Sequence, residues 1–222
     1  MSMTFDPYAS RNSLVDDDCA AHEDVLMTNP TALAELEAYW SALPRTRGLP
    51  KRTDLDPANL GPLLENAFVL ERIAPWVARI RVAGRAIAAL LGVEPRGLPL
   101  TAAFLPESRA AMANYIEAAF SRPSIVELPL EGPRALGQPR LQGRIMFLPL
   151  LDDFGRVSRA VGMLVMSGRK GLGGRRFVIS ESDAPRVEPV GTLKDVTGGR
   201  MTDRLVKKAE DKPALRLVVS NS

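Results

Sequence analysis

The apolar positions near the start of the chain recur at helical spacing. After "TNP" this spacing predicts a helix over roughly 30–43, with Asn29 as its cap and Pro30 in its first turn. The segment "DLDPANLGPLL" predicts a second, short helix, because Asp56 is a natural cap and Pro57 suits the first helical position.

The pattern then changes to a period near two, which is the spacing of strands. Residues 67–73 and 77–84 are rich in branched and aromatic side chains, and "APW" lies between them. They are predicted to form a β-hairpin. Arg79 and Arg81 share one face of its second strand, since side chains alternate across a sheet.

Helices and then strands follow the hairpin. A short helix is predicted to end at Gly92 and a longer one to span 107–121, followed by three strands at 124–132, 141–151 and 158–168, with a turn at "DDFG" before the last. Pro149 cannot donate to a ladder, so its end of the strand is expected at an edge or bulge. Strands that bracket helices predict an α+β domain, with one antiparallel sheet and helices on one face.

Three glycines in "AGRAIAALLGVEPRGLPL" invite comparison with a phosphate-binding loop. Such a loop needs closely spaced glycines between a strand and a helix, usually with a lysine. Gly84, Gly92 and Gly97 lie too far apart, and no lysine follows them. We therefore expect Gly84 to end a strand, Gly92 to end a helix and Gly97 to relax a loop.

The same stretch, with "FLPESRAAM" after it, resembles a PAS domain. More narrowly, "LEAYWSALPRTRGLPKRTDLDPANLGPLLENAFVLER" is similar to the leader of a bacterial family of short stand-alone PAS proteins, and "RIRVAGRAI" and "FLPLLDDFGRVSRAVGMLV" match later landmarks of that family. The resemblance runs from Leu33 to Val165. It implies a five-stranded antiparallel sheet with short helices on one face, an N-terminal leader helix, and a role in sensing, signalling or protein interaction.

Charge separates the two ends of the chain from its centre. Residues 1–28 carry one arginine against six acidic residues, and residues 169–222 carry twelve basic against seven acidic residues. We expect residues 1–30 to be an acidic, mostly disordered leader, 31–168 to be the PAS-like domain, and 169–222 to be a basic, partly disordered tail. The overall charge of +3 is too small to indicate nucleic-acid binding by itself.

The residue types needed for metal, cofactor or nucleophilic chemistry are scarce. His22 is the only histidine and Cys19 the only cysteine, and both lie in the acidic leader. A structural zinc site needs about four such ligands. Haem and photoactive flavin PAS domains use a histidine or a cysteine in a helix of the domain, so the resemblance implies neither cofactor here. We expect no metal, no cofactor and no catalysis.

The lone cysteine also excludes an intrachain disulfide. The N-terminus has no apolar signal segment, and no apolar run reaches the ~20 residues needed to cross a bilayer. We therefore expect a cytoplasmic protein that does not associate with membranes.

A cavity between sheet and helices is the first candidate binding site. Its predicted lining residues are Leu91, Phe104, Tyr115, Met146 and Met163. Such a set can hold a small apolar ligand or form plain core, and plain core is the commoner outcome.

Two residue pairs are candidates for interaction with a partner. Tyr39 and Trp40 lie on the leader helix, which can pack on its own sheet or on another subunit. Arg79 and Arg81 can pair with an acidic ligand or partner, or can form a solvated face.

These observations favour a non-catalytic sensory or regulatory PAS adaptor. It would bind a protein partner or a second copy of itself as a homodimer, and a small apolar ligand would tune it. Two alternatives remain: a small ligand-transforming enzyme on the same fold, and a nucleic-acid binder that uses the basic C-terminal tail.

Overall fold

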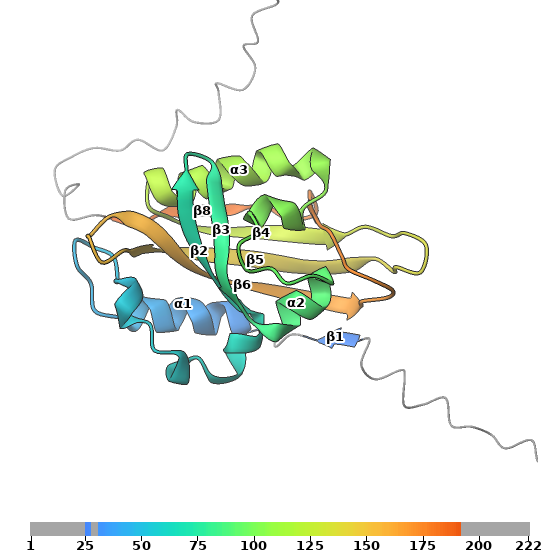
Figure 1. Ribbon diagram of the computed structural model, residues 1–222, viewed down its shortest axis with the longest axis horizontal. Helices are drawn as coiled ribbons and strands as arrows, with labels where there is room; N and C mark the ends of the chain where they lie inside the picture. The colour runs from blue at the N-terminus through green and yellow to red at the C-terminus, as the bar shows by residue number, and fades with distance from the viewer. Residues whose placement is uncertain (1–24, 28–30, 192–222) are drawn as a thin grey trace, which may run out of the picture. The chain divides into compact units, whose positions relative to one another are not determined.

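An antiparallel sheet is the centre of the fold in the computed structural model, which describes residues 25–27 and 31–191 (Figure 1). Its long strands lie side by side in the order β3-β2-β6-β5-β4. Their bounds are β2 Ala67–Ala74, β3 Val77–Ala83, β4 Ser124–Gly132, β5 Leu141–Leu151 and β6 Val157–Arg169. All the pairings among them are antiparallel. The predicted five-stranded sheet is confirmed.

Three short strands extend this sheet at its edges. β1 (Val25–Met27) pairs with the end of β6, while β7 (Val178–Ile179) and β8 (Arg186–Pro189) both pair with β4. The ordered fold therefore continues past residue 168, where we expected the domain to end. The remainder of the predicted tail, from 192 onwards, lies outside the described residues, as do Asn29 and Pro30.

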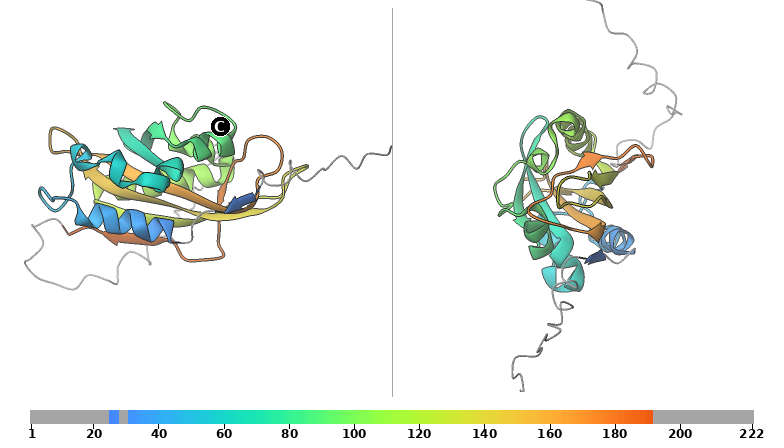
Figure 2. Two further views of the ribbon diagram at one scale, coloured as in Figure 1. Left: turned by 90° about the horizontal axis from the view of Figure 1, so that it is seen from below. Right: turned by 90° about the vertical axis from the view of Figure 1, so that its right-hand side faces the viewer.

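Helices cover both faces of the sheet (Figure 2). On one face lie α2 (Arg85–Leu91), the 3-10 turn η4 (Leu100–Ala103) and α3 (Pro106–Ser121); on the other lies the leader helix α1 (Ala32–Ala42). The 3-10 turns η1 (Arg52–Asp54), η2 (Pro57–Asn59) and η3 (Gly61–Asn66) connect α1 to β2. This arrangement is the expected α+β fold with an N-terminal leader helix.

Alternation along β5 shows why the sheet needs two covers. Ile145 and Phe147 are buried in the core under α2 and α3, whereas Met146 and Leu148 are buried in the core under α1. A strand that is buried on both faces has a continuous apolar run in its sequence, as "IMFLPLL" does.

The glycines have the structural roles that their spacing predicted. Gly92 follows α2 in the left-handed region, with φ 68°, and its N–H donates to the carbonyl of Ala88. A Cβ on Gly92 would lie 2.7 Å from the Cα of Gly174, so the close approach of a later loop also favours glycine. Gly84 ends β3, and its N–H donates to the carbonyl of Ala67 at 2.8 Å.

Pro149 lies on the central strand β5, at a point where that strand has only one neighbour. The ladder between β4 and β5 ends at Phe147, and Pro149 pairs with Ala160 of β6 alone. The edge predicted from Pro149 is therefore present only at this end of β5, although β5 is a central strand of the sheet. The segment before η1 covers it, because Leu151 donates its N–H to the carbonyl of Pro50 at 2.9 Å.

The turn between β5 and β6 is held by a buried carboxylate. Asp152 is 6% exposed and accepts hydrogen bonds from the backbone N–H groups of Phe154 and Arg156, both at 2.9 Å, and from the Ser158 hydroxyl at 2.8 Å. Burial alone would raise the pKa of Asp152. The bonds from the Arg156 N–H, the Ser158 hydroxyl, the Arg156 guanidinium and the Phe154 N–H outweigh burial and lower that pKa to about 2.

We predict that Asp152→Asn lowers the free energy of unfolding at pH 7 by roughly 1–2 kcal/mol. A carboxyl whose pKa is lowered by folding stabilises the native state above its unfolded pKa of about 3.9, and this contribution is lost as the pH falls towards 2. The stability difference between wild type and variant should therefore shrink between pH 4 and pH 2 in urea unfolding followed by circular dichroism.

Asp153 provides the matched control for this experiment, because it is the next residue and its side chain is exposed. Asp153→Asn should leave the unfolding free energy unchanged across the same pH range. A stability difference for Asp152→Asn that stays constant down to pH 2 would contradict the role given to its carboxylate.

Candidate functional site

The space between the sheet and the helices α2 and α3 is nearly filled. The remaining cavity has a volume of about 10 Å³ and is lined by apolar side chains, Leu91 and Phe104 among them. The rings of Phe104 and Phe177 meet edge to face with 6.5 Å between their centroids. A cavity needs about 10–15 Å³ and polar partners to hold even one water. The interior therefore has no room for a ligand in this conformation.

The five predicted pocket residues do not share one cavity. Leu91 and Phe104 line the small interior space, and Tyr115 packs, partly buried, against the same core. Met146 and Met163 are directly opposite each other on β5 and β6 and are buried on the other face, under α1. The spacing of residues within a strand shows which ones share a face, but it does not show which helix covers that face.

The leader helix is fastened to its own domain. Trp40 is 2% exposed, and its indole N–H donates to the carbonyl of Pro149 at 3.0 Å. The guanidinium of Arg45 lies 4.5 Å from the centre of the indole ring. The Tyr39 hydroxyl accepts from the N–H of Asp56 at 2.8 Å. The leader helix was expected to pack either on its own sheet or on another subunit. In the structure, Trp40 packs on its own sheet.

An ion pair joins this N-terminal helix to the C-terminal strand β8. Both terminal nitrogens of Arg186 donate to the carboxylate of Glu37, at 2.7 and 2.8 Å. The hydrogen bonds to Glu37 and Glu188 raise the pKa of Arg186, against the opposite effect of burial. The two ends of the described fold are therefore held together at one surface.

The two arginines predicted on β3 differ in their surroundings. Arg81 pairs with Glu71 of β2, and Glu71 also pairs with Arg159 of β6. Burial would raise the pKa of Glu71, but its hydrogen bonds to Arg159 and Arg81 lower it. Arg79 is exposed, and its backbone forms a bridge to Pro99.

The tip of the β2–β3 hairpin exposes a tryptophan, Trp76. The sequence analysis identified this segment only as a turn. Trp76 is 54% exposed and has a left-handed backbone, with φ 61°. Its N–H donates at 2.9 Å to the carboxylate of Glu117, which also accepts from Arg72 at 2.7 Å. Ile73 and Val77 beside it are 46% and 39% exposed. The signal available in the sequence was a tryptophan directly after a turn proline.

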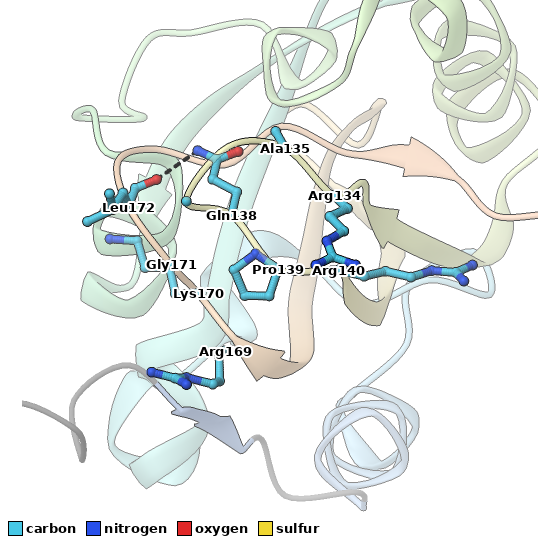
Figure 3. A pocket seen from close by; sticks show the side chains of 10 residues that line it. Arg134, Ala135, Gln138, Pro139, Arg140, Arg169, Lys170, Gly171 and Leu172 are labelled. Carbon is cyan, nitrogen blue, oxygen red and sulfur yellow. Dashed lines mark hydrogen bonds between the residues drawn. The ribbon is translucent and has the colours of Figure 1, made fainter.

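A basic platform forms where two loops meet beyond the far end of the sheet (Figure 3). The loop between β4 and β5 contributes Arg134 and Arg140, while Arg169 is the last residue of β6 and Lys170 begins the loop after it. We use "basic platform" for these four residues and the open pocket of about 850 Å³ that they line; among residues 25–27 and 31–191, no acidic residue belongs to that lining. Arg140 also pairs with Glu131 at 2.5 Å, outside the lining.

Arg175 is buried and links the two segments of the basic platform. It is 1% exposed, and its guanidinium donates to the carbonyls of Gly132, Pro139 and Lys170 at 3.0, 2.7 and 3.0 Å. Burial lowers the pKa of Arg175. Gln138 adds a second link, because its amide donates to the carbonyl of Leu172 at 2.7 Å.

The described residues offer little of the chemistry used by catalytic or metal sites. They contain neither histidine nor cysteine, since His22 and Cys19 both precede them. Within them, no group of three His, Cys, Asp or Glu side chains is placed to hold a metal ion. Across residues 25–27 and 31–191, no helix is long and apolar enough to span a bilayer.

We predict that Trp40→Phe lowers the free energy of unfolding by about 1–3 kcal/mol, because the buried carbonyl of Pro149 loses its donor. Thermal unfolding of the full chain measures this change. Leu43→Phe, at a half-buried position directly after α1, provides the control and should cost less. Equal stability of wild type and Trp40→Phe would contradict the proposed fastening of the leader.

Comparison with known proteins agrees with this architecture. A family model described as a PAS domain matches residues 27–165, which is more than half of the 222 residues. No curated protein matches the chain. The matched segment begins in β1, includes the leader helix and ends within β6. The chain therefore belongs to the PAS domain family, whose members serve sensory and regulatory roles.

Proposed function

We propose that this protein is a cytoplasmic, non-catalytic PAS adaptor that acts through contact with a protein partner or with a second copy of itself. The observation that carries this proposal is the β2–β3 hairpin tip, where Trp76 is presented to solvent between Ile73 and Val77. Tryptophan is among the residues that contribute most to binding energy at protein interfaces.

The backbone of Trp76 supports the same conclusion. A non-glycine residue in the left-handed region costs of order 1 kcal/mol or more, and such strain persists where the surrounding structure enforces it. Here the carboxylate of Glu117 holds the N–H of Trp76, and Arg72 holds Glu117. The backbone that carries the exposed indole is thereby held before any partner arrives, which lowers the entropic cost of binding.

The filled interior explains why we propose a surface contact. A small ligand would have to expand a cavity of about 10 Å³ that is lined by Phe104, Phe177 and other apolar side chains. A partner that touches the hairpin tip needs no such expansion. Only a difference in affinity between two arrangements of the domain shifts their populations, and a surface contact can provide it.

The two alternatives have weaker support. An enzyme would need polar groups converging in a cavity, but the lining of the interior is apolar. For a nucleic-acid binder, two of the basic residues between 169 and 191 are already engaged, because Arg175 holds backbone carbonyls and Arg186 holds Glu37. That alternative predicts binding that falls steeply with salt.

We predict that Trp76→Gly separates stability from association. Glycine adopts a φ of 61° without strain, so the melting temperature should stay the same or rise by a few degrees. Association should weaken by about ten-fold or more, because the indole is lost. Sedimentation velocity across a concentration series measures self-association, and capture from extracts of the source organism measures partner yield.

Phe154 provides the matched control, since it is an aromatic residue in another turn and is 82% exposed. Phe154→Ala should change neither assay. The proposal fails if Trp76→Gly and wild type show the same association state at every concentration and capture the same proteins in equal yield.

A further inference from the structure

Strand β1 brings the N-terminal part of the chain to the basic platform. Val25 pairs with Arg169, Leu26 with Gly168 and Met27 with Ser167, in antiparallel register. The first residue of β1, Val25, is therefore paired with Arg169, one of the four platform cations. In the sequence, Val25 directly follows Asp24.

The charge of that preceding stretch is opposite to the charge of the platform. Residues 16–24 read "DDDCAAHED", with five acidic residues and no lysine or arginine. The platform supplies Arg134, Arg140, Arg169 and Lys170. Of these, Arg140 also forms an ion pair with Glu131. Eight residues span at most about 29 Å, so the whole acidic stretch is within reach of the platform.

The platform is also built in advance of binding. The buried guanidinium of Arg175 donates to the carbonyls of Gly132, Pro139 and Lys170, so the backbone of both segments is held. The N–H of Leu172 donates to the carbonyl of Gly137 at 2.8 Å, which adds a backbone link between the loops. Because the backbone that carries the cations is held before an anion binds, only their side chains lose freedom on binding, and this favours binding.

We propose that the basic platform is a binding site for acidic polypeptide and that its occupant is the stretch 16–24 of this same chain. Attachment through β1 makes the contact intramolecular, so a weak electrostatic attraction suffices at a high effective concentration. An acidic segment of a partner would have to compete with this stretch for the platform. The proposal does not depend on the hairpin tip around Trp76.

The single cysteine of the chain allows a direct test in the full-length protein. Cys19 lies inside the acidic stretch, and a nitroxide attached to it broadens the amide signals of nearby residues. We expect the amides of Gly137 and Gly171 to lose most of their intensity relative to the reduced, diamagnetic label. The amides of Trp76 and Phe154, near the opposite end of the sheet, should keep theirs.

Attachment through β1 causes some broadening by itself, so the decisive comparison is between charged and neutral forms. Replacing the five acidic residues of 16–24 by Asn or Gln should restore most of the Gly137 and Gly171 intensity, and so should 0.5 M salt. Arg134→Gln combined with Lys170→Gln should do the same. Arg79→Gln combined with Arg96→Gln, at exposed positions outside the platform, is the matched control and should change nothing.

Several results would overturn the proposal. One is equal broadening in the charged and neutralised leaders, which would mean that attachment alone brings the label close. A second is broadening in a mixture of two chains, one isotopically enriched without a nitroxide and the other labelled with it. Broadening of the enriched chain would assign the contact to a second copy.

A third experiment measures binding to vesicles that contain phosphatidylserine, because Leu136 and Leu172 beside the platform are 102% and 74% exposed. Vesicle binding that is equally tight with the charged and the neutralised leader would assign the platform to a membrane surface.

Discussion

A sheet whose central strands are apolar on both faces must be covered on both, and the rest of this structure depends on that requirement. Helices α2 and α3 cover one face, and in the described residues the leader helix α1 covers the other, together with Leu49 and Leu60 from the segment that follows it. The contact of Trp40 with Pro149 satisfies a backbone group that β4 leaves without a partner. The leader is thus part of the core of the domain, and any change that displaces it would expose an apolar sheet face to water.

The sequence predicted the fold well because each element has a local signal. Helical spacing, the αL position at Gly92 and the turn at Asp152 all depend on residues close together in the chain. The candidate site was harder to predict. Which face of the sheet a side chain lies on, how deeply it is buried and what it contacts depend on residues that are far apart in the sequence. The methionines Met146 and Met163 illustrate this limit: their period within β5 and β6 was evident, but the identity of the covering helix depends on how α1 docks.

The basic platform shows the same limit for charge. Its four cations come from two segments some thirty residues apart, and no local pattern joins them. Arg175, which holds the loops together, looks in the sequence like one more residue of a basic tail. Trp76 had a local signal, but the carboxylate that holds its left-handed backbone comes from Glu117 of α3, which is distant in the sequence.

The two surfaces that we assign to binding lie near opposite ends of the β5–β6 ladder, so they cannot influence each other through electrostatics. Screening limits such effects to about 8 Å at physiological salt, whereas an 11-residue strand spans roughly 35 Å. Any coupling between them has to pass through packed elements. The leader is suited to this, because β1 pairs beside the platform and α1, a few residues later, covers β5 and β6. Helix α1 is itself held by the hydrogen bond of Trp40 to β5 and by the ion pair of Glu37 with Arg186 of β8. Coupling through the leader would therefore have to act against both contacts.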